Sequence, residues 1–306
     1  MNADAMLAVA AAVALAATGW GLYLVRGSTA VPAAAWGVAA AAAFLGEAVG
    51  RARGQLEDPA TAAVVRLAVA ALVVCPAMSL LGAKRPQHGV WQFIVGTLAF
   101  VLALPAVSAV LVRPGSMPDV HLLERGFFAV LVGVGWMNFV GTRHGVAATL
   151  ASAGMAGLVR DFLPGGDPGQ EGGGGLDLVA AALVAVGAVL AAWQSTRSPA
   201  QNPGLVGLAA AIDRPFLALR ETFGAAWTLR IAERFNAVAA ERSWPCRLQF
   251  SGVALDTGRN SPAAWEREAN RCFRALARRF VSEAWLARHG PAFPAEVRTS
   301  PTSKTH

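Results

Sequence analysis

The first 194 residues contain seven apolar stretches, each about long enough to cross a lipid bilayer. A transmembrane helix needs about 20 consecutive, mostly apolar residues to span a hydrocarbon core about 30 Å thick. Because lipid offers the backbone no hydrogen-bond partners, such segments fold as helices. The pattern therefore predicts an all-α integral membrane protein with a bundle of about seven spans. These spans are placed near residues 5–25, 31–50, 63–82, 90–112, 124–142, 145–162 and 177–194.

The composition agrees with a membrane protein and excludes several other classes. Hydrophobic residues make up 55% of the 306 residues and charged residues 15%, which is too apolar for an ordinary soluble domain. The three cysteines form no CxxC or similar pattern, so neither a zinc site nor a disulfide framework is indicated. No nucleotide-binding or catalytic motif is found. We therefore expect no cofactor and no metal, and favour a non-enzymatic function.

The fifth and sixth stretches are separated by a short polar turn that contains Arg143 and His144. A single helix over residues 126–159 would be about 51 Å long, far more than the membrane core requires. Gly141 and Gly145 bracket the polar pair, and glycine adopts the backbone angles of a tight reversal. The sequence predicts a helical hairpin here, with a re-entrant loop as the alternative.

The charges between the spans predict an orientation. Arg26 directly follows the first span and no basic residue precedes it, which favours an external N-terminus. Seven spans then place the C-terminus in the cytoplasm. Basic residues in the loops are otherwise evenly divided, whereas the loop acids fall on the outer side. We expect a multi-pass protein of a bacterial-type inner (plasma) membrane.

Five polar residues in or near the predicted spans are candidate functional residues, because charged groups inside a membrane are costly. Glu47 and Arg66 lie near the outer ends of adjacent spans. They either anchor the helices at the headgroups or pair in an outward vestibule. Asn138 is an uncharged polar residue in an apolar segment and fits an interhelical hydrogen bond. Arg143 and His144 complete the group on the inner side.

A basic tail begins after the last span. Residues 1–194 hold 10 basic and 10 acidic residues, whereas residues 195–306 hold 16 and 9, so the net charge of +7 lies in the tail. We divide the tail into a linker over residues 195–214, a basic amphipathic helical region over residues 215–290 and a disordered end over residues 291–306.

Two helices and a strand are expected in this basic region. Apolar residues recur every three or four positions from Pro215 to Glu241, which predicts one helix. The segment RLQFSGV, residues 247–253, fits a short strand. A second helix is predicted to begin at Ser261, a suitable N-cap, and to end at RHGP, residues 288–291. The tail should therefore form a small, mainly helical cytosolic region.

The second of these helices has two distinct faces. Its apolar side chains, including Phe273 and Leu276, lie on one side and four arginines on the other. Either the apolar face packs on the preceding helix and the arginines are solvated, or the basic face binds the anionic inner leaflet. No helix-turn-helix or zinc motif supports a nucleic-acid partner. The arginines are Arg267, Arg271, Arg274 and Arg278.

These features favour one function and leave a second open. The first is a membrane protein whose bundle anchors a basic helical tail, which docks on a cytosolic protein partner or on anionic lipid headgroups. The alternative is a small-solute transporter or channel component, favoured by the polar residues at both bundle ends and by Pro76 and Pro105 inside two spans. Against transport stand the lack of a mid-membrane charged pair and of internal repeats.

Overall fold

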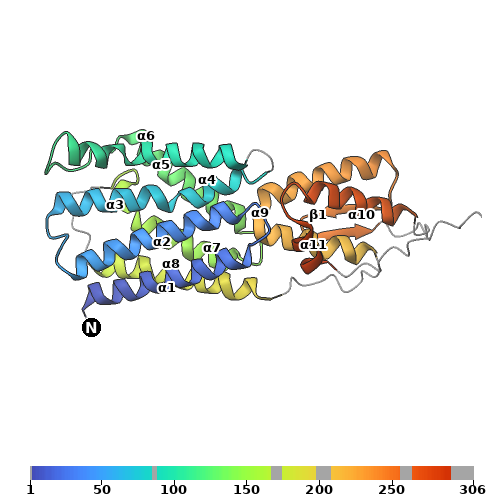
Figure 1. The fold of residues 1–306 in the computed structure, drawn as a ribbon, viewed down its shortest axis with the longest axis horizontal. Helices are drawn as coiled ribbons and strands as arrows, with labels where there is room; N and C mark the ends of the chain where they lie inside the picture. Colours follow the sequence, from blue (N-terminus) through green and yellow to red (C-terminus); the bar gives the residue numbers. More distant parts are fainter. Residues whose placement is uncertain (1, 85–87, 167–173, 198–207, 256–263, 291–306) are drawn as a thin grey trace, which may run out of the picture.

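A computed structural model describes residues 2–84, 88–166, 174–197, 208–255 and 264–290. The molecule is elongated and mostly helical, with a helical bundle on one side and a smaller C-terminal unit on the other (Figure 1). The C-terminal unit comprises the described residues from 208 onward. We call the end of the bundle that contacts this unit the proximal end, and the opposite end the distal end.

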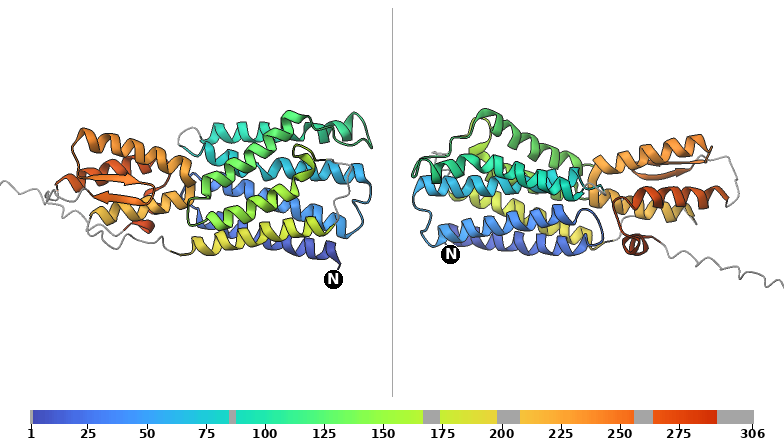
Figure 2. Two further views of the ribbon diagram at one scale, coloured as in Figure 1. Left: turned by 180° about the vertical axis from the view of Figure 1, so that it is seen from behind. Right: turned by 45° about the horizontal axis from the view of Figure 1, so that its top comes forward.

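The bundle helices lie side by side along the long axis of the molecule (Figures 1 and 2). Helices α1 and α8 both run from the distal to the proximal end, and the connections alternate between the two ends. The elements of the bundle are α1 Ala3–Leu24, α2 Val31–Ala52, α3 Pro59–Val73, α4 Cys75–Leu81, α5 His88–Leu111, α6 Leu122–Phe139, α7 Gly145–Leu158, the 3-10 turn η1 Arg160–Phe162, and α8 Gly174–Ser195.

Among the described residues, six helical segments are long and apolar enough to cross a membrane, counting α3 and α4 as one. The sixth predicted span, 145–162, corresponds to α7, which is helical for only 14 residues, about 21 Å, before the chain enters η1. The prediction of an apolar helical bundle is thus confirmed, although α7 is shorter than predicted. The predicted hairpin is present, because a tight turn at residues 140–144 joins α6 to α7.

Large apolar side chains cover much of the outer surface of the bundle. Phe93 is 76% exposed, Leu111 is 74% exposed and Leu123 is 87% exposed. Water-soluble proteins rarely gather exposed apolar residues of this size on one surface. Together with the length of the helices, this surface indicates a membrane location.

Pro76 interrupts the third span, as its position predicts. α3 ends at Val73 and α4 begins at Cys75, because proline lacks the amide hydrogen that would continue the helical hydrogen bonds. α5, in contrast, continues through Pro105. The prolines therefore do not share one structural effect, and they give no support to a moving gate.

Small residues bring α7 and α8 close together. A Cβ atom on Gly154 would lie 2.5 Å from the carbonyl oxygen of Ala180, and one on Gly187 would lie 2.8 Å from the backbone nitrogen of Ala151. Glycines that allow two backbones to touch are typical of helix packing in membranes, where the hydrophobic effect between helices is weak. The short α7 is thus held closely against α8.

Two elements predicted for the C-terminal unit differ from the structure. The helix predicted from Pro215 to Glu241 begins earlier, inside the predicted linker, and is broken at Gly224, whose φ of 74° is not helical. The first half of α9 runs toward the bundle, and the second half runs back away from it (Figure 1). The segment predicted as one strand is the central part of an antiparallel hairpin. The elements are α9 Leu208–Glu241, β1 Cys246–Gln249, β2 Gly252–Leu255, α10 Ala264–Ala277 and α11 Glu283–His289.

The last predicted helix is shorter than expected. α10 ends at Ala277, and the chain turns before α11 begins as a separate helix at Glu283. The expectation of one helix as far as residue 290 is therefore wrong. The predicted N-cap Ser261 and the predicted disordered end over residues 291–306 lie outside the described residues.

The apolar face of α10 packs on α9, in line with one of the two interpretations of this helix. Phe273 meets Phe216 edge-on with ring centroids 6.5 Å apart, and Phe280, in the turn after α10, meets Phe223 at 5.6 Å. All four rings are buried. Full burial of such a side chain contributes about 1.5–3 kcal/mol. α10 is therefore a core element of the C-terminal unit.

Candidate functional site

The five candidate polar residues lie in two groups at opposite ends of the bundle. Glu47 and Arg66 belong to a set of ion pairs at the distal end. Asn138, Arg143 and His144 contact the C-terminal unit at the proximal end. The structure therefore separates residues that one transport pathway would have to connect.

Arg66 is the centre of the distal group. Its Nε atom lies 3.3 Å from Glu47 Oε1 and its Nη1 atom lies 2.8 Å from Asp161 Oδ2. It also pairs with Asp177. The sequence suggested the pairing with Glu47 because the two residues lie on adjacent spans. Neither aspartate was predicted as a partner of Arg66, since both are about a hundred residues away along the chain.

Two further arginines balance the charge of the distal group. Arg51 lies 2.6 Å from Glu47 and 2.9 Å from Asp177, and Arg160 lies 2.6 Å from Asp177. Among the described residues, three arginines thus face three buried carboxylates, and the group has no net charge. A buried group in which each charge has an opposite partner fixes the helices that carry it, because loss of one partner leaves an uncompensated charge.

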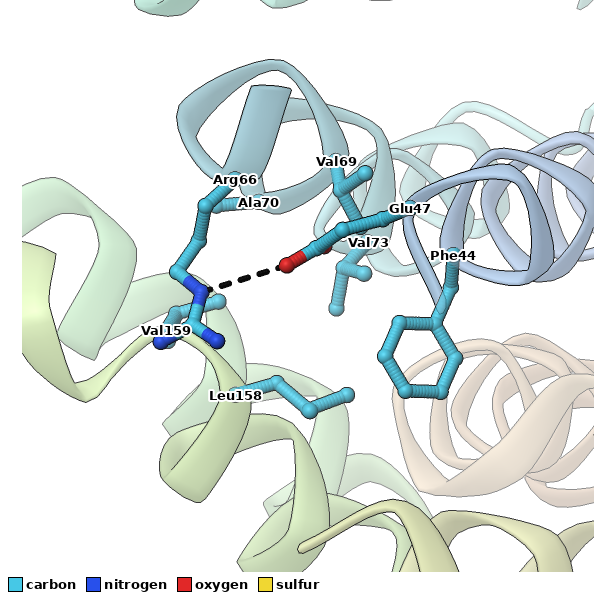
Figure 3. Close-up of a pocket in the computed structure, with 8 residues that line it drawn as sticks. All are labelled: Phe44, Glu47, Arg66, Val69, Ala70, Val73, Leu158 and Val159. Carbon is cyan, nitrogen blue, oxygen red and sulfur yellow. Dashed lines mark hydrogen bonds and ion pairs between the residues drawn. The ribbon is translucent and has the colours of Figure 1, made fainter. Parts of the chain in front are cut away.

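A small pocket lies beside this group, between α2, α3 and the end of α7. Figure 3 shows the side chains of Arg66 and Glu47 pointing toward each other at its edge, with Phe44 and Leu158 on its apolar side. The pocket has room for about one water molecule. The distal group is therefore a neutral, packed connection between helices rather than an open vestibule.

At the proximal end, Asn138 of α6 fills the break in α9. Its side-chain nitrogen donates a hydrogen bond to the carbonyl oxygen of Phe223 at 3.0 Å, and its side-chain oxygen accepts one from the amide of Ala226 at 2.9 Å. Backbone groups beside a helix end lack intrahelical partners. The predicted interhelical hydrogen bond is thus correct in kind, but its partner is the C-terminal unit and not another span.

Gly224 is required at this break. A Cβ atom at residue 224 would collide with the side chain of Asn138, and a φ of 74° is costly for any residue with a side chain. The regular apolar spacing around Gly224 hid the break in the sequence. A glycine inside an otherwise helical pattern was the available signal.

The two turn residues surround the buried carboxylate of Glu221 in α9. Arg143 donates its backbone amide to Glu221 at 3.1 Å, and its Nε atom lies 3.6 Å from the same oxygen. Arg220 contacts the other oxygen at 2.6 Å. His144 Nε2 lies 3.9 Å from the carboxylate, while His144 Nδ1 lies 3.0 Å from Gln194 Oε1. The polar turn between α6 and α7 therefore binds the C-terminal unit.

The surroundings of His144 favour its neutral form. Burial lowers the pKa of His144 below its usual value of 6.5, and the nearby Arg143 lowers it further. The carboxylate of Glu221 acts in the opposite direction but does not overcome the effect of burial. At neutral pH, Glu221 is therefore balanced by arginines and not by an imidazolium.

Main-chain pairing also joins the bundle to the C-terminal unit. Ser28, between α1 and α2, and Val281, after α10, form an antiparallel bridge that is flanked by backbone hydrogen bonds of 2.7 and 2.8 Å. The indole nitrogen of Trp227 donates to the carbonyl oxygen of Leu80 at 2.8 Å. Leu80 and Ala30 belong to the same buried apolar cluster as the core of the C-terminal unit. α10 ends where the chain turns to form the bridge between Val281 and Ser28.

The four arginines of the predicted basic face, three in α10 and Arg278 directly after it, are not equivalent. Arg274 and Arg278 both pair with Glu283 of α11, and these pairs lower the pKa of the Glu283 carboxyl. Arg267 and Arg271 are exposed, and no ion pair within the described ranges includes either one. α10 runs along the long axis of the molecule (Figures 1 and 2). Its arginines therefore lie at different distances from the bundle.

No family model, curated protein or solved structure matches this chain.

Proposed function

We propose that this protein is a multi-pass membrane protein that holds its C-terminal unit as a fixed basic platform on the cytoplasmic surface of the membrane. The platform, residues 208–290, binds an acidic protein partner through its exposed arginines. The observation that carries this proposal is the junction, where main-chain pairing, polar side chains and a shared apolar core join the platform to the bundle.

The nature of the junction supports a fixed arrangement. Domains in one chain move relative to each other unless their interface is large and hydrophobic. Here Trp227 packs against the proximal end of the bundle, and Asn138 satisfies backbone groups within α9. Release of the platform would expose the apolar surface around Leu80 and leave buried polar groups without partners. A freely moving tail could not keep these contacts.

Charge supports the assignment of the proximal end to the cytoplasm, because basic residues beside membrane spans mark the inner side. Arg26, Lys84 and Arg197 lie at this end. At the distal end, Arg51 and Arg160 are neutralised by buried carboxylates. The exposed Arg53 and Arg113 at this end are accompanied by the loop acids Glu57, Asp58 and Asp119. If α7 and η1 together form a short span in addition to the six long ones, the chain crosses seven times. The N-terminus then lies outside and the platform lies inside.

The direction of α10 favours a protein partner over the inner leaflet. A helix that binds a membrane surface lies in the plane of that surface. α10 instead runs along the axis of the bundle. Arg267 is therefore about 15 Å further from the bundle than the end of α10 at Ala277, at 1.5 Å per residue. Attraction to a charged surface fades within about 8 Å at physiological salt. Arg267 and Arg271 are thus better placed for the acidic surface of a soluble protein.

The transporter alternative has weaker support. The polar groups lie at opposite ends of the bundle, and the pocket beside Arg66 has room for about one water molecule. The distal group is neutral and packed. A solute pathway would need a wider opening and polar groups along its length.

Photocrosslinking in cells tests the proposed partner. A photoreactive amino acid at position 271 of the full-length protein should give an adduct with an acidic soluble protein. The same amino acid at position 123, on the apolar surface of the bundle, should give lipid adducts. The protein adduct should disappear when Arg267 and Arg278 are replaced by Glu. Exclusive lipid adducts from position 271 would contradict a protein partner.

A further inference from the structure

Exposed aromatic and basic side chains gather at the proximal ends of α1 and α8. The rings of Trp20 and Tyr23 stack with centroids 5.5 Å apart, and the guanidinium of Arg26 lies 4.6 Å from the Tyr23 ring. On α8, the guanidinium of Arg197 lies 3.6 Å from the ring of Trp193. All three rings are about half exposed, and none of them belongs to the buried core of the C-terminal unit. These contacts hold each arginine beside an aromatic ring.

The two helices place their arginines at the same depth. α1 and α8 each contain 22 residues, run in the same direction and pack side by side (Figure 1). Arg26 follows the end of α1 by two residues, and Arg197 follows the end of α8 by two residues. Each helix is about 33 Å long, slightly more than the hydrocarbon core. The arginines therefore fall at the headgroups, and the rings fall at the interface where Trp and Tyr are enriched.

Arg288 of α11 adds a further positive charge beside Arg26. Its Nη2 atom donates a hydrogen bond to the carbonyl oxygen of Arg26 at 2.7 Å. Arg26, Arg197 and Arg288 are all exposed, and no ion pair in the described part of the chain includes any of them. A guanidinium presents a fork of N–H donors that matches phosphate oxygens. Unpaired guanidinium groups at headgroup depth are therefore suited to a lipid phosphate.

We propose that this surface binds the headgroup of an anionic phospholipid in the cytoplasmic leaflet. Arg26 and Arg288 bind the phosphate, Arg197 contributes a second contact, and the three exposed rings lie beside the upper acyl chains. The inference rests on the bundle spanning a bilayer, which is part of the proposed function, but it is independent of the partner of α10. A headgroup held by Arg26 and Arg288 touches both the bundle and the platform, and so strengthens their junction.

Native mass spectrometry of the full-length protein in detergent tests this site. When phosphatidylglycerol and phosphatidylcholine are added in equal amounts, the native protein should retain phosphatidylglycerol preferentially. Replacing Arg26, Arg197 and Arg288 by Gln should lower this retention by about fivefold for each arginine, the factor that corresponds to about 1 kcal/mol per basic residue near a membrane surface.

A matched variant separates this site from general charge. Replacing Arg267, Arg271 and Arg279 by Gln removes the same charge from exposed positions of the platform, and should leave retention unchanged. Equal retention of the two lipids by the native protein, or equal losses in the two triple variants, would overturn the site. Displacement of phosphatidylglycerol by inorganic phosphate would mean that the arginines bind a free anion. Failure of crosslinking at position 271 would leave the lipid result intact.

Discussion

At the scale of single residues, Asn138 and Gly224 depend on each other. The glycine allows the sharp break in α9, and the asparagine satisfies the backbone groups that the break exposes. An asparagine in an apolar helix would otherwise be a cost to the bundle. Its position next to the last residue of α6 gives it access to the C-terminal unit. The pair therefore explains why a polar side chain is placed at the end of α6.

Replacing Asn138 by Leu should loosen the platform while the bundle stays folded. Leucine leaves the Phe223 carbonyl and the Ala226 amide without partners, and each such buried group costs about 1–3 kcal/mol. Hydrogen exchange should therefore rise around the break in α9 and stay slow in α1 and α8. Gly133→Ala, at a position in α6 with no atom within 4 Å of the new Cβ, should leave exchange unchanged. Unaltered exchange in Asn138→Leu would show that this side chain does not hold the platform.

His144 should weaken the junction in acid. Because burial lowers its pKa, the folded state binds fewer protons than the unfolded state below the usual value of 6.5. The stability contributed by the neutral ring is therefore complete above this pH and declines as the pH falls below it. Between about pH 7.5 and pH 5, the native protein should lose more unfolding free energy than His144→Gln. His289, whose pKa burial also lowers, is present in both proteins and cancels in the comparison. Identical losses would show that His144 does not titrate at the junction.

At the scale of elements, apolar length predicted the bundle helices well, because membrane thickness imposes that length whatever the neighbours are. The ends of α1, α2 and α8 lie within a few residues of prediction. The positions at which the helices of the C-terminal unit are interrupted were harder to predict. Gly224 and the turn before α11 are determined by contacts with the bundle, and those contacts join residues far apart in sequence. Local apolar spacing carries no information about them.

The distal group shows the same limit for charged residues. Glu47 and Arg66 lie on consecutive spans, so their pairing could be anticipated. Asp177 lies 111 residues from Arg66 and became a partner only through the packing of α8 against the other helices. The sequence therefore identified Arg66 and Glu47 at the centre of the distal group but not its other members. The zero net charge of the group could not be inferred from the predicted pair alone.

Replacing Arg66 by Met should destabilise the bundle strongly. Methionine fills similar space but leaves Glu47, Asp161 and Asp177 with too few cations, and breaking a buried pair in this way costs about 3–5 kcal/mol. The thermal unfolding temperature in detergent should therefore fall well below that of the native protein. Arg113→Met, an exposed change in the same region, serves as the control. Equal unfolding temperatures for native and Arg66→Met protein would mean that the distal group is not structural.

The contact between α7 and α8 makes a separate prediction. Valine at Gly154 would place side-chain atoms against the backbone of α8, so Gly154→Val should force the two helices apart. Gly133→Val is the matched change, because its side chain enters open space. The yield of folded, monodisperse protein after size-exclusion chromatography should drop for Gly154→Val only. Comparable yields would indicate that α7 tolerates a wider separation from α8.

At the scale of the whole molecule, the bundle and the platform form one continuous structure. The bundle carries an apolar outer surface and a neutral group of ion pairs at its distal end, whereas the proximal end carries exposed aromatic rings with Arg26 and Arg197 beside them. The platform extends from this end with its arginines along α10. Such an arrangement suits a protein that presents a binding surface at a set distance from the membrane.

The most direct test of this arrangement is disulfide formation between Ser28→Cys and Val281→Cys in isolated membranes. These residues form a bridge between the flanking hydrogen bonds, a pairing in which Cα atoms lie about 4.5 Å apart and within the range of a disulfide. Mass spectrometry after mild oxidation should find the crosslinked peptides in most molecules. Ser28→Cys with Arg267→Cys, at the far part of α10, should give none. Absence of the 28–281 crosslink, or equal crosslinking in both pairs, would contradict a platform fixed to the proximal end of the bundle.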